Sequence, residues 1–320
     1  MGIPAIWVAA LVYAAEITLL SIGFTLTYLT AKIPNFAHGT YAGFGIYVVY
    51  TISKILNMSP YIGFPISFFV GGGVSVLVFI IVIQVLGRMG SGAIVLTIAT
   101  LAIQIFLTSA LYIYAFWIRT LYSTYTVGFL LKELDFEFMG MPGILYVSVS
   151  ICVCTVIVLH YMLTRTKTGI AMRACAEDTE LSSVLGIDVN RIQLFSWFLT
   201  GGLAALAGSM MPLWFASSPA LGSFMITSIM AASLLGGFNN VYGAIIGGIG
   251  IGFSEILLTF FLQQRIGIWV GEYRPLIPMI VLVTVLLIEP NGLQGVWVRL
   301  QNSDIGQNLL KMIGRGGVEE

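Results

Sequence analysis

Two carboxylates stand inside long apolar stretches of the sequence, where an ionised side chain is costly. Glu16 lies in the apolar run 6–30, and Glu255 lies in a second run that covers 242–262. Because charge is expensive in hydrocarbon, both are candidates for binding a ligand or carrying a proton. The alternative is a structural carboxyl group that is protonated or hydrogen-bonded between helices. Neither residue has an obvious basic partner within a span, which favours the structural interpretation.

Polar residues and glycines surround two breaks in the apolar pattern. In the first, IPNFAHG at 33–39, Pro34 cannot continue a helix and Asn35 can cap a new one. The second is LGGFNN at 235–240. Interrupted membrane segments in opposite halves of a chain can line a central polar path; a plain interfacial turn is the alternative for the first break. The predicted path residues are Asn35, Phe36, His38, Gly39, Gly236, Gly237, Phe238 and Asn239.

Glycines continue beyond the second break at a spacing that favours close helix contact. Gly243 and Gly247 form one pair four residues apart, and Gly248 and Gly252 form another. Small residues at this spacing let helix backbones approach each other in a membrane. The run also resembles part of a dinucleotide-binding fingerprint, but no strand precedes it, so we interpret it as packing.

The longest charged segment before the C-terminal tail contains a short amphipathic helix signal. Residues 178–186 (DTELSSVLG) begin with a capping residue, Asp178 or Thr179, and end at a glycine. Leu181, Val184 and Leu185 would share one face. Such an apolar face needs either a partner protein or the chain's own bundle to cover it. The residues expected at a partner contact are Arg173, Glu177, Asp178, Glu180, Leu181, Val184, Leu185 and Gly186.

The composition of the chain indicates a membrane protein, so membrane-spanning helices must position these polar and charged residues. Of 320 residues, 58% are hydrophobic and 9% are charged, against about 25% charged in an ordinary soluble domain. Positive and negative charges cancel, so nothing indicates a nucleic-acid partner. We predict an all-α, polytopic membrane helix bundle of about eight or nine segments, some of them broken or re-entrant. The segments are 6–30, 36–52, 64–86, 93–117, 145–163, 194–215, 224–235, 242–262 and 275–288.

Basic residues predict the orientation of the bundle. Arginine and lysine concentrate in 164–193 and in the tail, so both are expected to be cytoplasmic, with 118–143 outside. The predicted division is a membrane domain over 1–298, which includes the cytoplasmic loop 164–193, and a cytoplasmic tail over 299–320. Nine spans would place the N-terminus outside, whereas eight with one re-entrant piece would place it inside. The sequence contains no H-E-x-x-H, G-x-S-x-G or P-loop motif, so we expect neither an enzyme nor a nucleotide site of its own.

Several of these stretches together resemble the permease subunits of branched-chain amino acid ABC importers, of the LivH type. The resemblance runs from about residue 18 to 295. Two departures stand out: Pro34 is inserted into the usual I-N-F-A-H-G, and residues 238–242 (FNNVY) replace a small G-S-x-P-like turn. The matching stretches are 33–39, 173–191, the glycine-rich 235–255 and 289–293 (EPNGL).

The resemblance implies a multi-subunit importer in the cell membrane. Its partners would be a related second permease subunit, two cytoplasmic ATP-binding subunits and an extracytoplasmic substrate-binding protein. Residues 178–186 would be the coupling helix that contacts an ATP-binding subunit. The implied activity is ATP-driven alternating access for leucine, isoleucine or valine. Urea or a short amide is an alternative substrate, and a proton-coupled secondary transporter using Glu16 or Glu255 is an alternative mechanism.

No metal or prosthetic group is expected to bind this chain. Its two histidines and three cysteines are scattered without the spacing of a zinc site. Elemental analysis of the purified protein should therefore find metal well below one equivalent per chain. One equivalent that survives dialysis against a chelator would contradict this prediction.

Overall fold

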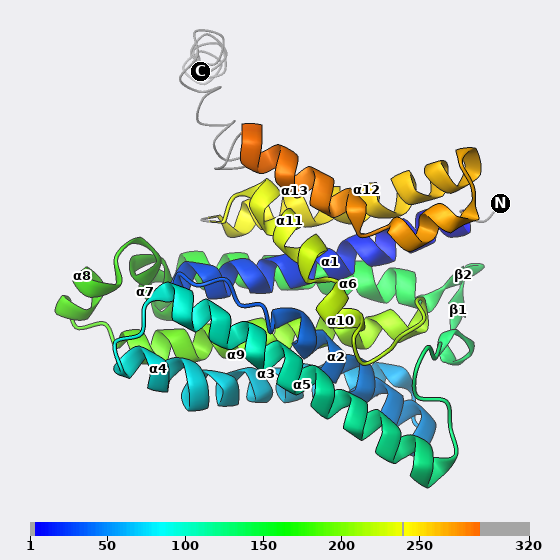
Figure 1. The fold of residues 1–320 in the computed structure, drawn as a ribbon, viewed down its shortest axis with the longest axis horizontal. Coiled ribbons are helices and arrows are strands. Elements are labelled where there is room, and N and C mark those ends of the chain that lie inside the picture. The colour runs from blue at the N-terminus through cyan, green and yellow to red at the C-terminus, as the bar shows by residue number, and fades with distance from the viewer. Residues whose placement is uncertain (1–3, 239, 289–320) are drawn as a thin grey trace, which may run out of the picture.

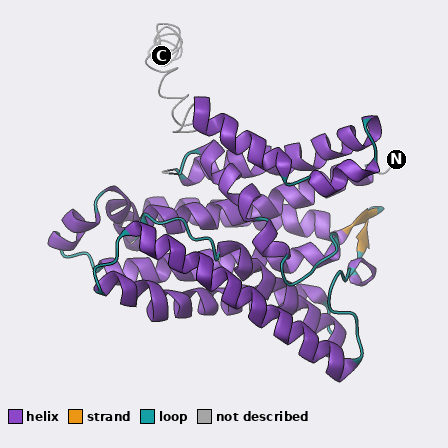
Figure 2. Ribbon diagram, in the orientation of Figure 1, coloured by secondary structure: helices purple, strands orange, loops and turns teal. Residues whose placement is uncertain are grey.

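Helices make up most of the computed structural model, which describes residues 4–238 and 240–288 (Figures 1 and 2). The long helices run roughly side by side, so the bundle has two ends (Figure 1). We call the end that carries α8 (Thr179–Val184) the α8 end. The opposite end carries strands β1 (Glu137–Phe138) and β2 (Met141–Pro142) and is called the hairpin end. The predicted all-α membrane bundle is confirmed.

Six helical stretches in the described ranges are long and apolar enough to cross a membrane. They are α1 (Ala5–Ala31), Pro60–Arg88, α5 (Ala93–Tyr122), α6 (Gly143–Arg165), Val189–Leu213 and α12 (Val241–Arg265). Pro60–Arg88 consists of a 3₁₀ turn at Pro60–Ile62, α3 (Gly63–Val78), a π-helical turn at Phe79–Ile83 and α4 (Gln84–Arg88). Val189–Leu213 is α9 (Val189–Met210) followed by a 3₁₀ turn at Met211–Leu213.

Three further segments are shorter, and the sequence had marked each of them as short. The first is α2 (His38–Tyr50), which continues into a π-helical turn at Thr51–Ile55. The second consists of α10 (Leu221–Phe224) and α11 (Ile226–Gly236). The third is α13 (Leu276–Ile288), which follows a 3₁₀ helix at Ile268–Tyr273. Together with the six long stretches they account for the predicted segments.

Helices α1 and α9 form the centre of the bundle. The most apolar 18-residue windows of these two spans are each 72% buried, whereas that of α5 is only 17% buried. Helix α1 packs against α12, α9, α6 and α11, and α9 packs in turn against α3 and α2. The exposed apolar faces of α5 and α6 are compatible with lipid, because hydrocarbon does not penalise them.

Glycines set the closest helix contacts, as the sequence predicted for α12. A side chain at Gly243 or Gly247 would collide with the backbone of α11, and one at Gly248 or Gly252 with the backbone of α1. The two glycine pairs therefore face different partners, and α12 lies tightly between them. Comparable backbone contacts join Gly71 to Gly201, Gly45 to Ala205 and Gly208 to Ala42.

The chain re-enters the bundle between α1 and α2. Lys32 takes a left-handed conformation (φ 55°) at the end of α1, and residues 32–37 run back without forming a helix. The predicted span began at Phe36, but α2 begins at His38. Asn35 does not cap α2, because the N-cap position is Ala37 and no side chain caps the helix; instead the Asn35 Oδ1 accepts a hydrogen bond from the Ala37 amide at 3.1 Å. Its effect is to shape the turn before the helix.

The charged stretch 164–193 is more ordered than the predicted loop with one short helix. It contains a second helix, α7 (Lys167–Glu177), before α8, and α9 already begins at Val189. The prediction missed α7 because its positions are mostly polar and small. Each helix has its own side-chain cap: Thr166 for α7, Asp178 for α8 and Asp188 for α9.

The loop at the hairpin end is pinned to the bundle. Phe129 and Ser217 exchange backbone hydrogen bonds that join this loop to the one before α10. The Asp135 carboxylate accepts hydrogen bonds from the Tyr61 hydroxyl and the Ile144 amide. Between these anchors lie a 3₁₀ turn at Lys132–Leu134 and the antiparallel β1–β2 pair. The predicted tail, 299–320, lies outside the described residues.

The two predicted loops, 164–193 and 118–143, lie at opposite ends of the bundle, and α1 begins at the hairpin end (Figure 1). On the predicted orientation the start of α1 is therefore outside, as nine crossings require. Which end faces the cytoplasm stays a prediction that single-cysteine labelling can test.

Val184 and Tyr125 offer a matched pair of labelling sites, because their side chains are 82% and 86% exposed at opposite ends. In a variant whose three native cysteines are replaced, an impermeant maleimide should label Tyr125→Cys in sealed right-side-out membranes. When the chain is expressed without its proposed partner subunits, Val184→Cys should react only after permeabilisation. Labelling of Val184→Cys in the sealed membranes would reverse the topology.

Candidate functional site

His38 fastens the start of α2 to the middle of α1. Its Nε2 lies 2.9 Å from the backbone oxygen of Leu20. A carbonyl oxygen can only accept, so Nε2 carries the hydrogen and donates it. The imidazole is fully buried and meets the rings of Phe24 and Tyr41 edge-on. His38 is thus a hydrogen-bonding residue that positions the first break.

A hydroxyl cluster that the sequence analysis missed surrounds the start of α2. Thr40 Oγ1 lies 3.1 Å from Ser223 Oγ, which is 2.9 Å from Thr108 Oγ1. These residues come from α2, α10 and α5, so the cluster joins three elements that are distant in sequence. Beside it, the backbones of Gly39 and Gly222 touch, with no room for a side chain on either. Single hydroxyl residues in apolar spans gave no sequence signal of this cluster.

The second break lies against the same central helix as the first. Helix α11 ends at Gly236, and Gly237 adopts φ 96°, a backbone conformation that favours glycine. The Phe238 ring packs 4.6 Å from Tyr28 and 6.0 Å from Phe24, measured between centroids. Since Phe24 also contacts His38, the side chains of α1 connect the two predicted breaks. Asn239 lies outside the described residues.

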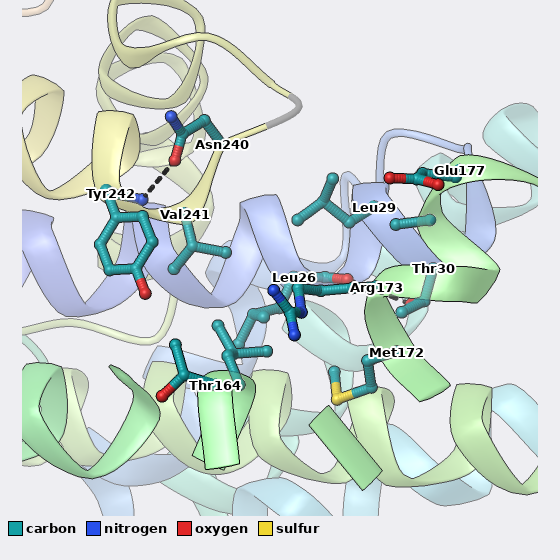
Figure 3. Close-up of a pocket in the computed structure, with 12 residues that line it drawn as sticks. Leu26, Leu29, Thr30, Thr164, Met172, Arg173, Glu177, Asn240, Val241 and Tyr242 are labelled. Atoms are coloured by element: carbon teal, nitrogen blue, oxygen red, sulfur yellow. Dashed lines mark hydrogen bonds between the residues drawn. The ribbon is translucent and has the colours of Figure 1, made fainter. Parts of the chain in front are cut away.

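A cavity of about 240 Å³ at the α8 end joins the second break to the predicted coupling segment (Figure 3). One wall is the start of α12, where Asn240 caps the helix by accepting a hydrogen bond from the Tyr242 amide at 2.9 Å. The facing wall is α7, which contributes Arg173 and Glu177. The end of α1 and the end of α6 complete the lining. Two constellations that were separate in the sequence therefore share one cavity.

The apolar face of α8 is open to solvent in this chain. Leu181, Val184 and Leu185 are 56%, 82% and 71% exposed. The alternative in which this helix packs back on its own bundle is therefore wrong for these three side chains. Asp178 caps the helix through the amides of Glu180 and Leu181, and Gly186 (φ 85°) ends it.

Glu255 has a basic partner after all. Arg274, just before α13, donates from Nε to Glu255 Oε1 at 2.8 Å, and the Tyr13 hydroxyl donates to the same oxygen at 2.9 Å. The sequence analysis considered basic residues only within spans, whereas this arginine follows the 3₁₀ helix outside them. Glu16 lines the same cavity as this pair. Within the described ranges, neither Glu16 oxygen has a hydrogen-bond partner.

Comparison with known proteins assigns the chain to a family. Residues 6–286 match the model described as "Branched-chain amino acid transport system / permease component". The chain belongs to this permease family. It is 38% identical over 302 residues to a probable branched-chain amino acid transport permease protein LivH of Methanocaldococcus jannaschii, covering 94% of this chain and 96% of the relative.

Other relatives are more distant. The permease protein BraD of a high-affinity branched-chain amino acid transport system in Pseudomonas aeruginosa is 25% identical, with 90% of this chain and 94% of BraD covered. The ribose import permease protein RbsC of Haemophilus influenzae is 28% identical over about half of each chain. The structure of PsaBC from Streptococcus pneumoniae in complex with Fab shares the fold, with a TM-score of 0.50 at 13% identity, covering 88% of this chain and 91% of that one. The named relatives LivH, BraD and RbsC are transport permease proteins.

The Gly39–Gly222 contact provides a test of how the first break is held. Gly39→Ala should destabilise the protein by about 1–3 kcal/mol, because the new methyl group meets the backbone of α10. The measurement is thermal unfolding of the purified permease in detergent. Gly73→Ala in α3 is the matched control, since no atom lies within 4 Å of the added carbon. Equal stability of both variants would contradict the close packing of α2 on α10.

Proposed function

We propose that the chain is one membrane subunit of an ATP-driven importer of branched-chain amino acids, with ATP hydrolysed by separate cytoplasmic subunits. The observation that carries this proposal is the exposed apolar face of α8 on an anchored α7–α8 unit. Family membership supports the substrate class, since several relatives carry branched-chain amino acid transport in their names. A related second permease subunit and an extracytoplasmic binding protein complete the proposed assembly in the cell membrane.

Work has to enter this chain through a contact, because its sequence has no P-loop motif. The α8 face supplies three adjacent apolar side chains. Burying each is worth roughly 1.5–3 kcal/mol before ordering costs. Arg173, Glu177 and Glu180 are exposed charged residues of the same α7–α8 unit. A cytoplasmic ATP-binding subunit with an apolar groove and a charged rim fits this surface.

Helix α7 is built to transmit a displacement of α8. The inner face of α7 is buried at Met172 and Cys175. This burial also raises the pKa of the Cys175 thiol, so the thiol stays protonated and unreactive. Gly169 lies directly against the backbone of α6 at Met162 and Leu163. Because the two backbones are in direct contact, α7 and the end of α6 should move together.

The displacement would then reach the second break. His160 Nδ1 on α6 lies 2.8 Å from the Tyr242 hydroxyl at the start of α12. Helix α7 faces the same segment across the cavity in Figure 3. In this mechanism, motion of α7 and α8 changes the cavity and shifts the α11–α12 turn, which opens or closes the path at the α8 end. The predicted path residues at both breaks would line or shape that path.

Leu185→Asp should uncouple transport from ATP hydrolysis. The variant would bury an unpaired carboxylate in the proposed contact, which is costly. We expect loss of ATPase co-purification, or at least a tenfold loss of substrate-stimulated hydrolysis, with the membrane bundle still folded. Val127→Asp at the hairpin end is the control, since Val127 is also apolar and is 52% exposed.

Intact assembly and stimulated hydrolysis in Leu185→Asp would exclude α8 as the coupling element. Uptake that survives ATP depletion but collapses with a proton uncoupler would instead favour the secondary-transporter alternative. Uptake of urea or short amides in place of leucine would correct the substrate class alone.

A further inference from the structure

A second cavity, of about 340 Å³, lies between α1, α10, α12 and the start of α13. This volume is in the range of small-molecule binding sites, roughly 300–1,000 Å³. Glu16, Glu255 and Arg274 all line it, together with Tyr13. Glu16 is 11 residues from the start of α1, or about 16 Å along the helix, so the cavity lies beside the middle of this 27-residue span.

Three of these groups are held in fixed positions. Arg274 and Tyr13 both bind Glu255 Oε1, as described above. The guanidinium also lies over the Tyr13 ring, 4.1 Å from its centroid. Stacking and a charge-assisted hydrogen bond restrict the arginine strongly, because its planar group satisfies both at once. The charged groups are therefore preorganised, with one oxygen of Glu255 already engaged.

The remaining polar atoms of the cluster are buried and unused. Within residues 4–238 and 240–288, both oxygens of Glu16, Glu255 Oε2 and Arg274 Nη2 have no hydrogen-bond partner. Glu16 is 0% exposed and Glu255 is 3% exposed. Unpaired buried polar groups are costly and rare in folded proteins. Three acceptors and one donor that border the same cavity form a set that a ligand could satisfy.

The unused atoms match one chemical class. An ammonium group has three N–H donors, the number of free carboxylate oxygens, and a carboxylate accepts from an arginine N–H. The rest of the wall is largely apolar, with side chains that suit an aliphatic group: Met211, Phe215, Phe224 and Met225. We propose that this cavity binds an α-amino acid with an aliphatic side chain, its ammonium on Glu16 and Glu255 and its carboxylate on Arg274.

An α-amino acid fits the cluster better than an amine alone or a carboxylic acid alone. A zwitterion brings no net charge into the membrane, so its transfer leaves the charge balance of the cluster unchanged. An amine would leave Arg274 Nη2 unsatisfied, and a carboxylic acid would leave the free Glu oxygens unsatisfied. The inference rests on the proposed function and deepens it by placing a substrate site within this subunit.

The cavity is close to the predicted path. Helix α10 separates the two, since Leu221 and Phe224 line the cavity while Gly222 and Ser223 contact α2. A shift of this four-residue helix would open the cavity toward the hydroxyl cluster of Thr40, Thr108 and Ser223. The substrate would then occupy this site as an intermediate binding position, after its delivery at the hairpin end and before its release at the α8 end.

Glu16→Gln tests the site without disturbing the fold. Glu16 makes no hydrogen bond within the described chain, so the isosteric amide should leave thermal stability unchanged or raise it. In the transporter purified with its co-expressed partner subunits, equilibrium binding of radiolabelled L-leucine without binding protein should weaken at least tenfold. Isopentylamine and 4-methylpentanoate should each compete at least tenfold less well than L-leucine. Glu272→Gln is the control, because Glu272 is an exposed carboxylate two residues from Arg274.

The outcomes separate the site from the function. Wild-type proteoliposomes that import leucine, with unchanged leucine binding in Glu16→Gln, would overturn the site and leave the proposed function standing. A lower unfolding temperature in Glu16→Gln would overturn it in favour of a structural carboxyl group. Equal competition by the amine would overturn the role of Arg274. Absence of branched-chain amino acid uptake by the wild-type transporter would instead refute the proposed function.

Discussion

The structure depends on one constraint: a helix that breaks inside a membrane exposes backbone groups that only neighbouring protein can satisfy. The two predicted breaks, before α2 and between α11 and α12, are both covered by α1. Leu20 of α1 accepts the hydrogen bond of His38 at the start of α2, while Phe24 and Tyr28 pack against Phe238 after α11. The central helix therefore has to be long and buried, and α1 is both, with 27 residues of which most are buried. An interruption in α1 would leave both breaks unsupported.

Close backbone packing is the second consequence of this arrangement. Lipid supplies no hydrophobic drive for helices to associate, so contact area and fit have to do so. Helix α12 shows how the glycine pattern meets this need, with Gly243 and Gly247 facing α11 and Gly248 and Gly252 facing α1. Contacts without free space also transmit displacement, because packed elements shift as bodies and do not deform gradually. The same property that holds the bundle together suits it to alternating access.

Polar groups in the bundle divide into two kinds. One kind consists of hydroxyl groups that form hydrogen bonds between α1 and α9 and hold the two helices together: those of Thr27, Thr30, Ser196 and Thr200. Both carboxylate oxygens of Glu16 and the Oε2 atom of Glu255 are buried and have no hydrogen-bond partner among the described residues. The proposed ligand would offset their cost to stability, since proteins retain unsatisfied buried charges mainly where function needs them. Other buried atoms among the described residues, such as the Tyr41 hydroxyl and Trp197 Nε1, also lack a partner, but Glu16 and Glu255 differ from these in lining one cavity together with Arg274.

The sequence by itself determined the membrane class, the short segments, the glycine contacts and the short helix at 178–186, because these follow from local composition and spacing. It did not reveal α7, whose residues are mostly small or polar, nor the exact start of α2 two residues after Phe36. Tertiary structure alone decided which side chains from distant parts of the sequence contact each other. Arg274 pairs with Glu255 only because α13 turns back beside α12, and Ser223 meets Thr40 and Thr108 only because α10 re-enters the bundle. Such pairings join residues 19 to 183 positions apart, and no local pattern encodes them.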